Sequence, residues 1–144
     1  MSRPRVKSAI YCCLALGAAS GAQSALAKPV LLQTVELEDM STDGGEAKLY
    51  RATTPALAPC RMDVIHYGES GRAGYVFIFG SRLQSATRTE YRYNLPYYMT
   101  GGGKVASTHS ITLKSAAGRK QLEADFAEYK AKFDPRKLAQ CETR

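Results

Sequence analysis

Hydrophobic and polar residues alternate along most of the chain between residues 30 and 113, with the period of two that is typical of half-buried β-strands. The run at 60–67 shows it well, because Met62 and Val64 share one side and Arg61 and Asp63 share the other. In the first run we expect Leu31 on the same side as the later apolar residues Val35 and Leu37. The alternating runs are 30–39, 47–54, 60–67, 75–80, 82–94 and 105–113. They predict an antiparallel sheet of about five or six strands.

The segments between these runs carry turn chemistry. YVFIFG at 75–80 is apolar on both faces, which predicts a central strand, and GESGRAG before it predicts a hairpin loop between this strand and the run at 60–67. LPYYMTGGG at 95–103 is expected to be a long hairpin loop. Its three glycines precede Lys104 without forming a phosphate-binding motif, because Tyr98 and Val105 stand where that motif needs a glycine and a hydroxyl residue. The glycines are interpreted as a mobile tip or as backbone with positive φ.

After Ser115 the period changes to that of a helix. An apolar stripe at spacings of four, three and four predicts an amphipathic helix over 117–133. The stripe consists of Leu122, Phe126, Tyr129 and Phe133. Asp134 and Pro135 are typical of an N-cap and a first helical position, so a short second helix follows. Strands followed by helices predict an α+β domain with the C-terminal helix packed on one face of the sheet.

The first 27 residues have the organisation of a secretory signal peptide. Three basic residues precede an apolar run from about residue 9 to residue 19, and Ala25 and Ala27 fit a cleavage site. The run is shorter than the ~20 residues that a permanent membrane anchor needs. We therefore expect a mature single domain over 28–144 in a bacterial periplasm or outside the cell, with no stable membrane insertion after cleavage. An uncleaved anchor is the alternative.

Loss of the leader changes the charge. The whole chain carries +7, but the leader holds three basic residues and no acid, which leaves 17 basic against 13 acidic residues, a balance of +4. The basic residues are spread along the chain and form no clustered stripe, so nucleic acid is not an expected partner.

Two cysteines, Cys60 and Cys141, remain after the leader and its Cys12 and Cys13 are removed. In an oxidising compartment such a pair is expected to form a disulfide, which here would close a loop of about 80 residues. Neither cysteine belongs to a CxxC pair, which disfavours the alternative of a thiol catalyst. Because no tight cluster of cysteine and histidine exists, no metal site is predicted, and no cofactor motif is present.

Tyrosines are concentrated in YRYNLPYYMTGGGK at 91–104. Tyrosine combines a large flat apolar surface with a hydroxyl at low entropic cost, which favours interfaces and stacking against sugar rings. Tyr97, Tyr98 and Met99 are the predicted apolar anchor of a recognition loop. The predicted polar rim consists of Arg92, Lys104, Arg72 and Glu69. In the alternative interpretation the tyrosines are structural, and Tyr91 and Tyr93 alternate onto the core face.

The only histidines, His66 and His109, each fall on the apolar face of a predicted strand, which favours a core or rim role. If the two strands were neighbours, the histidines could meet each other or Asp63 and form a general base. The sequence favours a small, non-catalytic binding protein of the inhibitor or immunity type, whose partner is a protein or an envelope polymer. The alternatives are a small hydrolase or ligand carrier that uses His66 or His109, and an accessory subunit of an envelope or secretion assembly.

Overall fold

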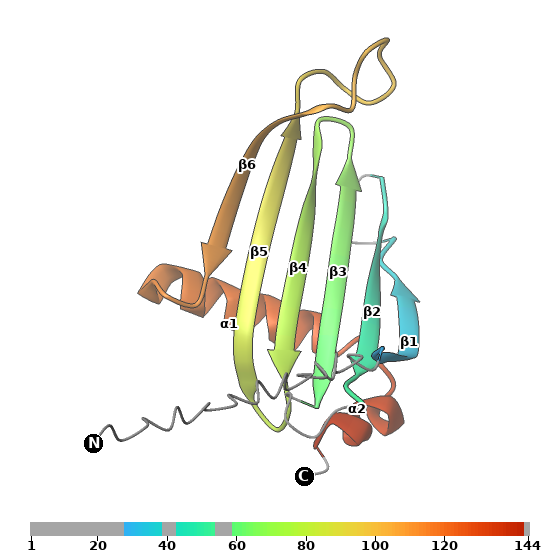
Figure 1. The fold of residues 1–144 in the computed structure, drawn as a ribbon, viewed down its shortest axis with the longest axis vertical. Coiled ribbons are helices and arrows are strands. Elements are labelled where there is room, and N and C mark those ends of the chain that lie inside the picture. Colours follow the sequence, from blue (N-terminus) through green and yellow to red (C-terminus); the bar gives the residue numbers. More distant parts are fainter. Residues whose placement is uncertain (1–27, 39–42, 54–58, 143–144) are drawn as a thin grey trace, which may run out of the picture.

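Six strands follow one another along the chain and pair in that same order, each antiparallel to the next (Figure 1). The computed structural model describes residues 28–38, 43–53 and 59–142. The strands are β1 (Val30–Glu36), β2 (Gly45–Arg51), β3 (Cys60–Gly68), β4 (Gly71–Phe79), β5 (Leu83–Tyr93) and β6 (Val105–Thr112). The predicted leader, residues 39–42 of the first run and its turn, and most of the connection around residues 55–59 lie outside the described residues.

Two helices follow the sheet. α1 (Ala116–Lys130) begins after Ser115, whose hydroxyl accepts a hydrogen bond from the backbone N–H of Gly118. α2 (Pro135–Glu142) begins after Asp134, whose carboxylate accepts from the N–H of Arg136 at 2.8 Å, as predicted for an N-cap. α1 crosses one face of the sheet near its lower end in Figure 1, and the strands extend past it toward the β5–β6 loop. The predicted α+β architecture is confirmed.

The core lies between α1 and the face of the sheet that it covers, here called the helix face. Every second residue of β3 and β4 points there, and Met62 and Phe77 are completely buried. From α1, Leu122 is fully buried and Tyr129 is almost so. The predicted stripe is therefore confirmed, although α1 ends at Lys130 and buried Phe133 follows in the turn.

The predicted disulfide between Cys60 and Cys141 is present, with a Cα–Cα distance of 5.4 Å. It joins the first residue of β3 to α2, and both cysteines are fully buried. The bond closes a loop with a sequence separation of 81 residues, so it ties the C-terminal helix to the middle of the sheet.

The expected orientation of Leu31 is wrong. Its side chain is 51 % exposed, whereas Val35 and Leu37 pack against the core as predicted. The register of β1 against β2 shifts between Leu31 and Gln33, which is the signature of a β-bulge. The extra residue reverses the alternation, and Leu31 turns away from the helix face.

The predicted glycine loop at 68–74 is mostly strand. β4 begins at Gly71, and only Glu69 and Ser70 form the turn between it and β3. A Cβ atom on Gly71 would lie 2.2 Å from the carbonyl oxygen of Tyr91, so close approach to β5 requires the glycine. The predicted central strand is confirmed, because β4 lies between β3 and β5.

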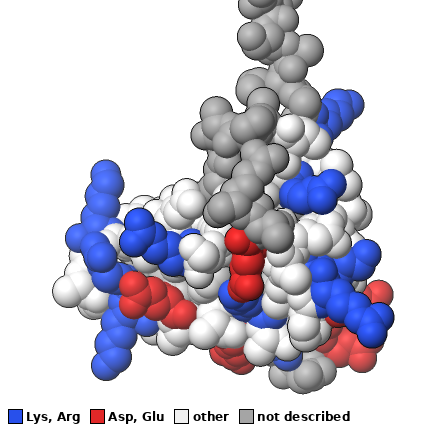
Figure 2. Space-filling view, turned by 90° about the horizontal axis from the view of Figure 1, so that it is seen from below, with Lys and Arg blue, Asp and Glu red and all other residues white. Residues whose placement is uncertain are grey.

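Charged side chains of both signs are interspersed on the lower end of the molecule. Figure 2 shows lysines and arginines in several groups with aspartates and glutamates between them. In the part of the chain that the structure describes, no helix is long and apolar enough to cross a membrane.

Candidate functional site

The connection between β5 and β6, residues 94–104, projects beyond the ends of the strands and is called the tip loop below (Figure 1). Backbone hydrogen bonds cross it, from Asn94 to Lys104 at 2.8 Å and from Gly103 to Leu95 at 3.2 Å. The amide of Tyr97 also donates to the carbonyl of Glu69 at 3.1 Å, which fastens the loop to the β3–β4 turn. The tip loop therefore has a defined internal hydrogen-bond network.

Its three glycines are required by this backbone. Gly101 and Gly103 have φ values of 76° and 78°, in the left-handed region that favours glycine. A Cβ atom on Gly102 would lie 1.9 Å from the carbonyl oxygen of Pro96. The interpretation of the glycines as backbone with positive φ is thus confirmed for two of the three.

The predicted anchor residues are all exposed. Tyr97 is 55 %, Tyr98 63 % and Met99 47 % accessible, and the two tyrosine rings meet edge to face with centroids 5.7 Å apart. Leu95 and Val105 add exposed apolar surface next to them. This group, the tip patch, consists of Leu95, Tyr97, Tyr98, Met99 and Val105.

The four predicted rim residues come from different elements but lie at the same end of the sheet. Glu69 lies in the β3–β4 turn and Lys104 directly precedes β6, and both are exposed. Arg72 and Arg92 are also exposed, but cross-strand register places them on opposite faces, opposite Tyr91 and Gly71 respectively. The structure thus places charged residues on both sides of the tip loop.

The alternative that put Tyr91 and Tyr93 on the core face is wrong. Neither is among the buried residues, and Tyr91 pairs with Arg72 on the face opposite the helix, here called the open face. The guanidinium of Arg72 lies 4.8 Å from the centre of the Tyr91 ring. The helix face of β5 instead carries Arg88 and Glu90, which lie opposite Tyr75 and Ala73 of β4.

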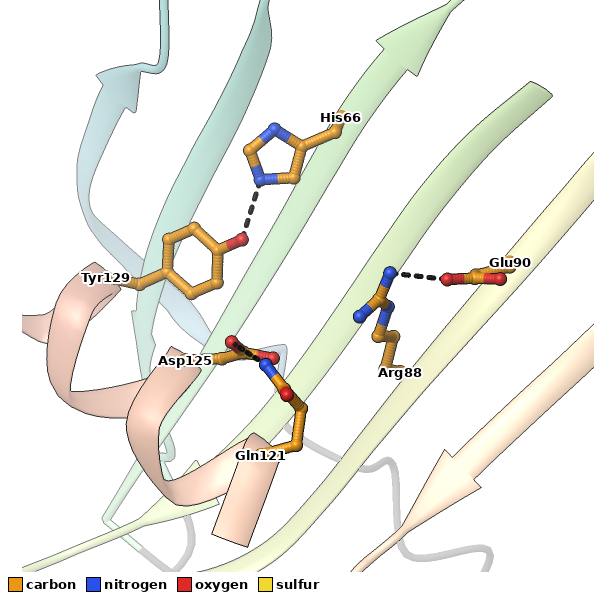
Figure 3. A network of polar contacts seen from close by, with 6 residues as sticks. All are labelled: His66, Arg88, Glu90, Gln121, Asp125 and Tyr129. Atoms are coloured by element: carbon orange, nitrogen blue, oxygen red, sulfur yellow. Dashed lines mark hydrogen bonds and ion pairs between the residues drawn. The ribbon is translucent and has the colours of Figure 1, made fainter. Parts of the chain in front are cut away.

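A polar network that the sequence did not reveal joins the sheet to α1 (Figure 3). The Nε2 atom of His66 lies 2.7 Å from the hydroxyl oxygen of Tyr129. Arg88 forms an ion pair with Glu90, and its guanidinium also lies 5.4 Å from the centre of the Tyr75 ring. Two sequence patterns could have indicated this network. Arg88 and Glu90 alternate with Thr89 on β5, and Gln121 and Asp125 have the i, i+4 spacing of neighbours on one face of α1.

Burial lowers the pKa of His66, and the nearby positive charge of Arg88 lowers it further, against smaller opposing effects of Glu128 and Asp125. Burial also raises the pKa of Tyr129. The histidine is therefore neutral near pH 7. Its Nδ1 atom is enclosed without a hydrogen-bond partner, so protonation there is unfavourable.

The condition for a two-histidine site is not met. β4 and β5 separate His66 on β3 from His109 on β6, and Asp63 points to the open face. His66 lines a hollow of 290 Å³ that also contacts Glu90 and Arg92, but its Nε2 is already engaged by Tyr129. Among the described residues no group of three or more potential ligands is arranged to hold a metal ion.

Comparisons with protein-family models, with curated proteins and with solved structures gave no match. The site is therefore interpreted from its own geometry.

Proposed function

We propose that this protein is a small exported, non-catalytic binding protein that acts by steric contact, in the manner of an inhibitor or an immunity protein. Its proposed partner is a protein that receives the tip patch in a depression. The supporting observation is that three adjacent anchor side chains are exposed on a loop whose backbone is internally hydrogen-bonded.

The internal hydrogen bonds of the tip loop reduce the entropy that the loop would lose on binding. A binding loop that is disordered before association loses entropy when it binds, whereas a preorganised loop loses less. Tyr97 and Tyr98 each contribute a large ring with few rotatable bonds, and such rings are frequent among the residues that dominate interface energies. Charged residues at the edge of such a patch contribute more to orientation and association rate than to affinity.

Export is part of the proposal. The Cys60–Cys141 disulfide is compatible with an oxidising compartment. If the leader is cleaved as we propose, intact-mass analysis of the protein purified from a periplasmic fraction gives a chain that begins at Lys28. A full-length chain in the cytosol with both thiols reduced would contradict export.

The function is tested with the double variant Tyr97→Ala/Tyr98→Ala. The matched control is Val30→Ala/Leu31→Ala, which removes two exposed apolar side chains from β1, at the end of the sheet away from the tip loop. Wild type and both variants are immobilised and exposed to the same envelope extract, and bound proteins are quantified by mass spectrometry. We expect a protein that wild type and control retain and the tyrosine variant loses.

Affinity and stability separate the proposal from a structural role of the tyrosines. With the purified partner, calorimetric titration is expected to show a Kd at least 30-fold weaker for the tyrosine variant, which corresponds to about 2 kcal/mol. Its thermal midpoint should stay close to that of the wild type, because both rings are exposed. A large fall of the midpoint would assign the rings to the fold and refute the proposal.

A further inference from the structure

The open face of the sheet carries a hollow of 420 Å³ across the middle of β2 to β5. Cross-strand register arranges its lining in rows. The row nearest the tip loop contains Arg72 and Tyr91. The next row contains Glu46, Ile65, Gly74 and Thr89. The row after that also runs across all four strands and consists of Lys48, Asp63, Val76 and Thr87. We call this hollow the open-face groove.

Gly74 forms the floor of the groove, and the fold does not require a glycine there. A Cβ atom on Gly74 would meet no atom nearer than 3.9 Å, and its φ is not positive. Every other glycine in the described ranges either has a positive φ or would bring a Cβ within 3.3 Å of a neighbouring atom. Glycine in the interior of a strand weakens the strand, and it often marks a place where a ligand approaches the backbone closely.

The chemistry around Gly74 is mixed. Ile65 and Val76 are half-buried and offer small apolar surfaces beside the glycine backbone. Thr87 and Thr89 provide hydroxyl groups, of which that of Thr89 already lies 3.1 Å from the hydroxyl of Ser110 and has at least one further hydrogen-bonding site for a ligand. Tyr91 provides a ring edge with Arg72 stacked on its face. Apolar patches next to hydroxyl and charged groups suit the ring of a sugar, which has apolar C–H faces and polar edges.

The charged residues on the open face restrict the net charge of the ligand. On this face Lys48 pairs with Glu46 at 2.6 Å, and Arg61 pairs with Asp63 at 2.6 Å. Arg72 has no ion-pair partner among the described residues, which leaves one positive charge at the edge of the groove. A ligand that is neutral or carries one negative charge fits this balance, whereas a polyanion would meet the carboxylates of Glu46 and Asp63.

We propose that the open-face groove binds a saccharide that is neutral or singly anionic, with one sugar ring over Gly74. The proposal depends on the open face and not on the tip patch, and of the groove residues only Arg72 also belongs to the predicted rim of the tip loop. Arg72 would bind a carboxylate or hydroxyl of the sugar, and the two threonines would exchange hydrogen bonds with its hydroxyls.

The test uses Gly74→Val, which fills the floor with a residue that favours strands. The matched control is Ser85→Val, an exposed position on the open face of β5 outside the groove. The probes are purified oligosaccharides on an array: neutral hexoses, N-acetylhexosamines and chains that contain a uronic acid. The best probe is then titrated in solution against the full mature chain by calorimetry.

We expect wild type and Ser85→Val to bind the same oligosaccharide, and Gly74→Val to bind it at least tenfold more weakly with an unchanged or raised thermal midpoint. Thr89→Val replaces the hydroxyl by a methyl group and also removes the exposed hydrogen bond to Ser110. It should weaken sugar binding without loss of the fold. The proposal is overturned if no probe binds the wild type, or if Gly74→Val binds as well as the wild type. It is also overturned if the wild type binds no sugar and sedimentation shows that the wild type is a dimer whereas Gly74→Val is a monomer. A second copy of the chain would then occupy the groove.

Discussion

The imidazole of His66 and the hydroxyl of Tyr129 are 2.7 Å apart and connect β3 to α1 across the edge of the core. The two rings also pack against each other, with centroids 5.6 Å apart. His66 is only 8 % exposed, and Tyr129 only 4 %. The contact assigns His66 to the interface between sheet and helix.

This contact predicts a pH dependence of stability. Burial and Arg88 lower the pKa of His66 in the folded chain, whereas the unfolded chain retains a pKa of about 6.5. Below that value the unfolded state binds a proton that the native state does not, so the free energy of unfolding falls as the pH falls toward the native pKa. Urea unfolding at pH 7.5, 6.5 and 5.5 should show this loss.

Variants test whether His66 causes this pH dependence of the free energy of unfolding. His66→Gln is expected to flatten the stability profile between pH 7.5 and 5.5, whereas His109→Gln on the exposed β6 should keep the wild-type slope. An unchanged slope in His66→Gln would contradict the assignment.

The same contact predicts an energetic coupling. Tyr129→Phe removes the hydroxyl and leaves the buried Nε2 of His66 without its partner, which costs about 1–3 kcal/mol. The control Tyr67→Phe removes a hydroxyl from a ring that is 44 % exposed and should change stability little. In a double-mutant cycle with His66→Leu, the cost of Tyr129→Phe should fall once the imidazole is absent. Additive costs would mean that the two groups do not interact.

The alternation of hydrophobic and polar residues was sufficient to predict which way side chains point where one face of a strand is buried along its whole length. On β3 the inward Met62 and Val64 alternate with the outward Arg61 and Asp63, because α1 covers one face there and solvent the other. The disulfide followed from counting the cysteines that lie outside the predicted leader. The apolar stripe of α1 was predictable for the same reason, since its burial has the period of the helix.

Features that depend on distant segments were not predictable. The alternation placed Tyr91 on one face of β5 but could not say whether that face is buried. Tertiary packing decides which face α1 covers and how far along β5 the helix reaches. Gly71 belongs to β4 because the backbone of Tyr91 approaches it closely, a contact between residues 20 positions apart. The open-face groove depends on the register of four strands, so no linear motif could have located Gly74 in its floor.

The disulfide is expected to contribute strongly to stability. Closing a loop with a separation of 81 residues restricts the unfolded chain by about 4 kcal/mol in the chain-entropy model. Urea unfolding of Cys60→Ala/Cys141→Ala should therefore show a loss of this order, and added reductant should not destabilise that variant further. A loss below about 1 kcal/mol would show that the unfolded chain is already restricted without the bond.

The hydrogen bonds that order the backbone of the tip loop include those of Asn94, a residue that is not part of the tip patch. Substitution of Asn94 should therefore loosen the loop. The side-chain oxygen of Asn94 accepts from the N–H of Lys104 at 3.1 Å, and its nitrogen donates to the carbonyl of Gly101 at 3.3 Å. Asn94→Ala removes both hydrogen bonds, each with a net contribution of about 0.5–1.5 kcal/mol. Amide hydrogen exchange should accelerate at Lys104 while the amides of β3 and β4 keep their protection.

Asn94→Asp is the matched comparison, because it retains the acceptor for Lys104 and loses only the donor to Gly101. Its exchange rates should lie between those of wild type and Asn94→Ala. If the tip loop binds a protein partner as proposed, the same order should hold for affinity, with a several-fold rise of Kd for Asn94→Ala that arises from the ordering cost and not from a lost contact. Exchange that accelerates with no change in Kd would separate the order of the loop from binding and locate the partner's contact elsewhere.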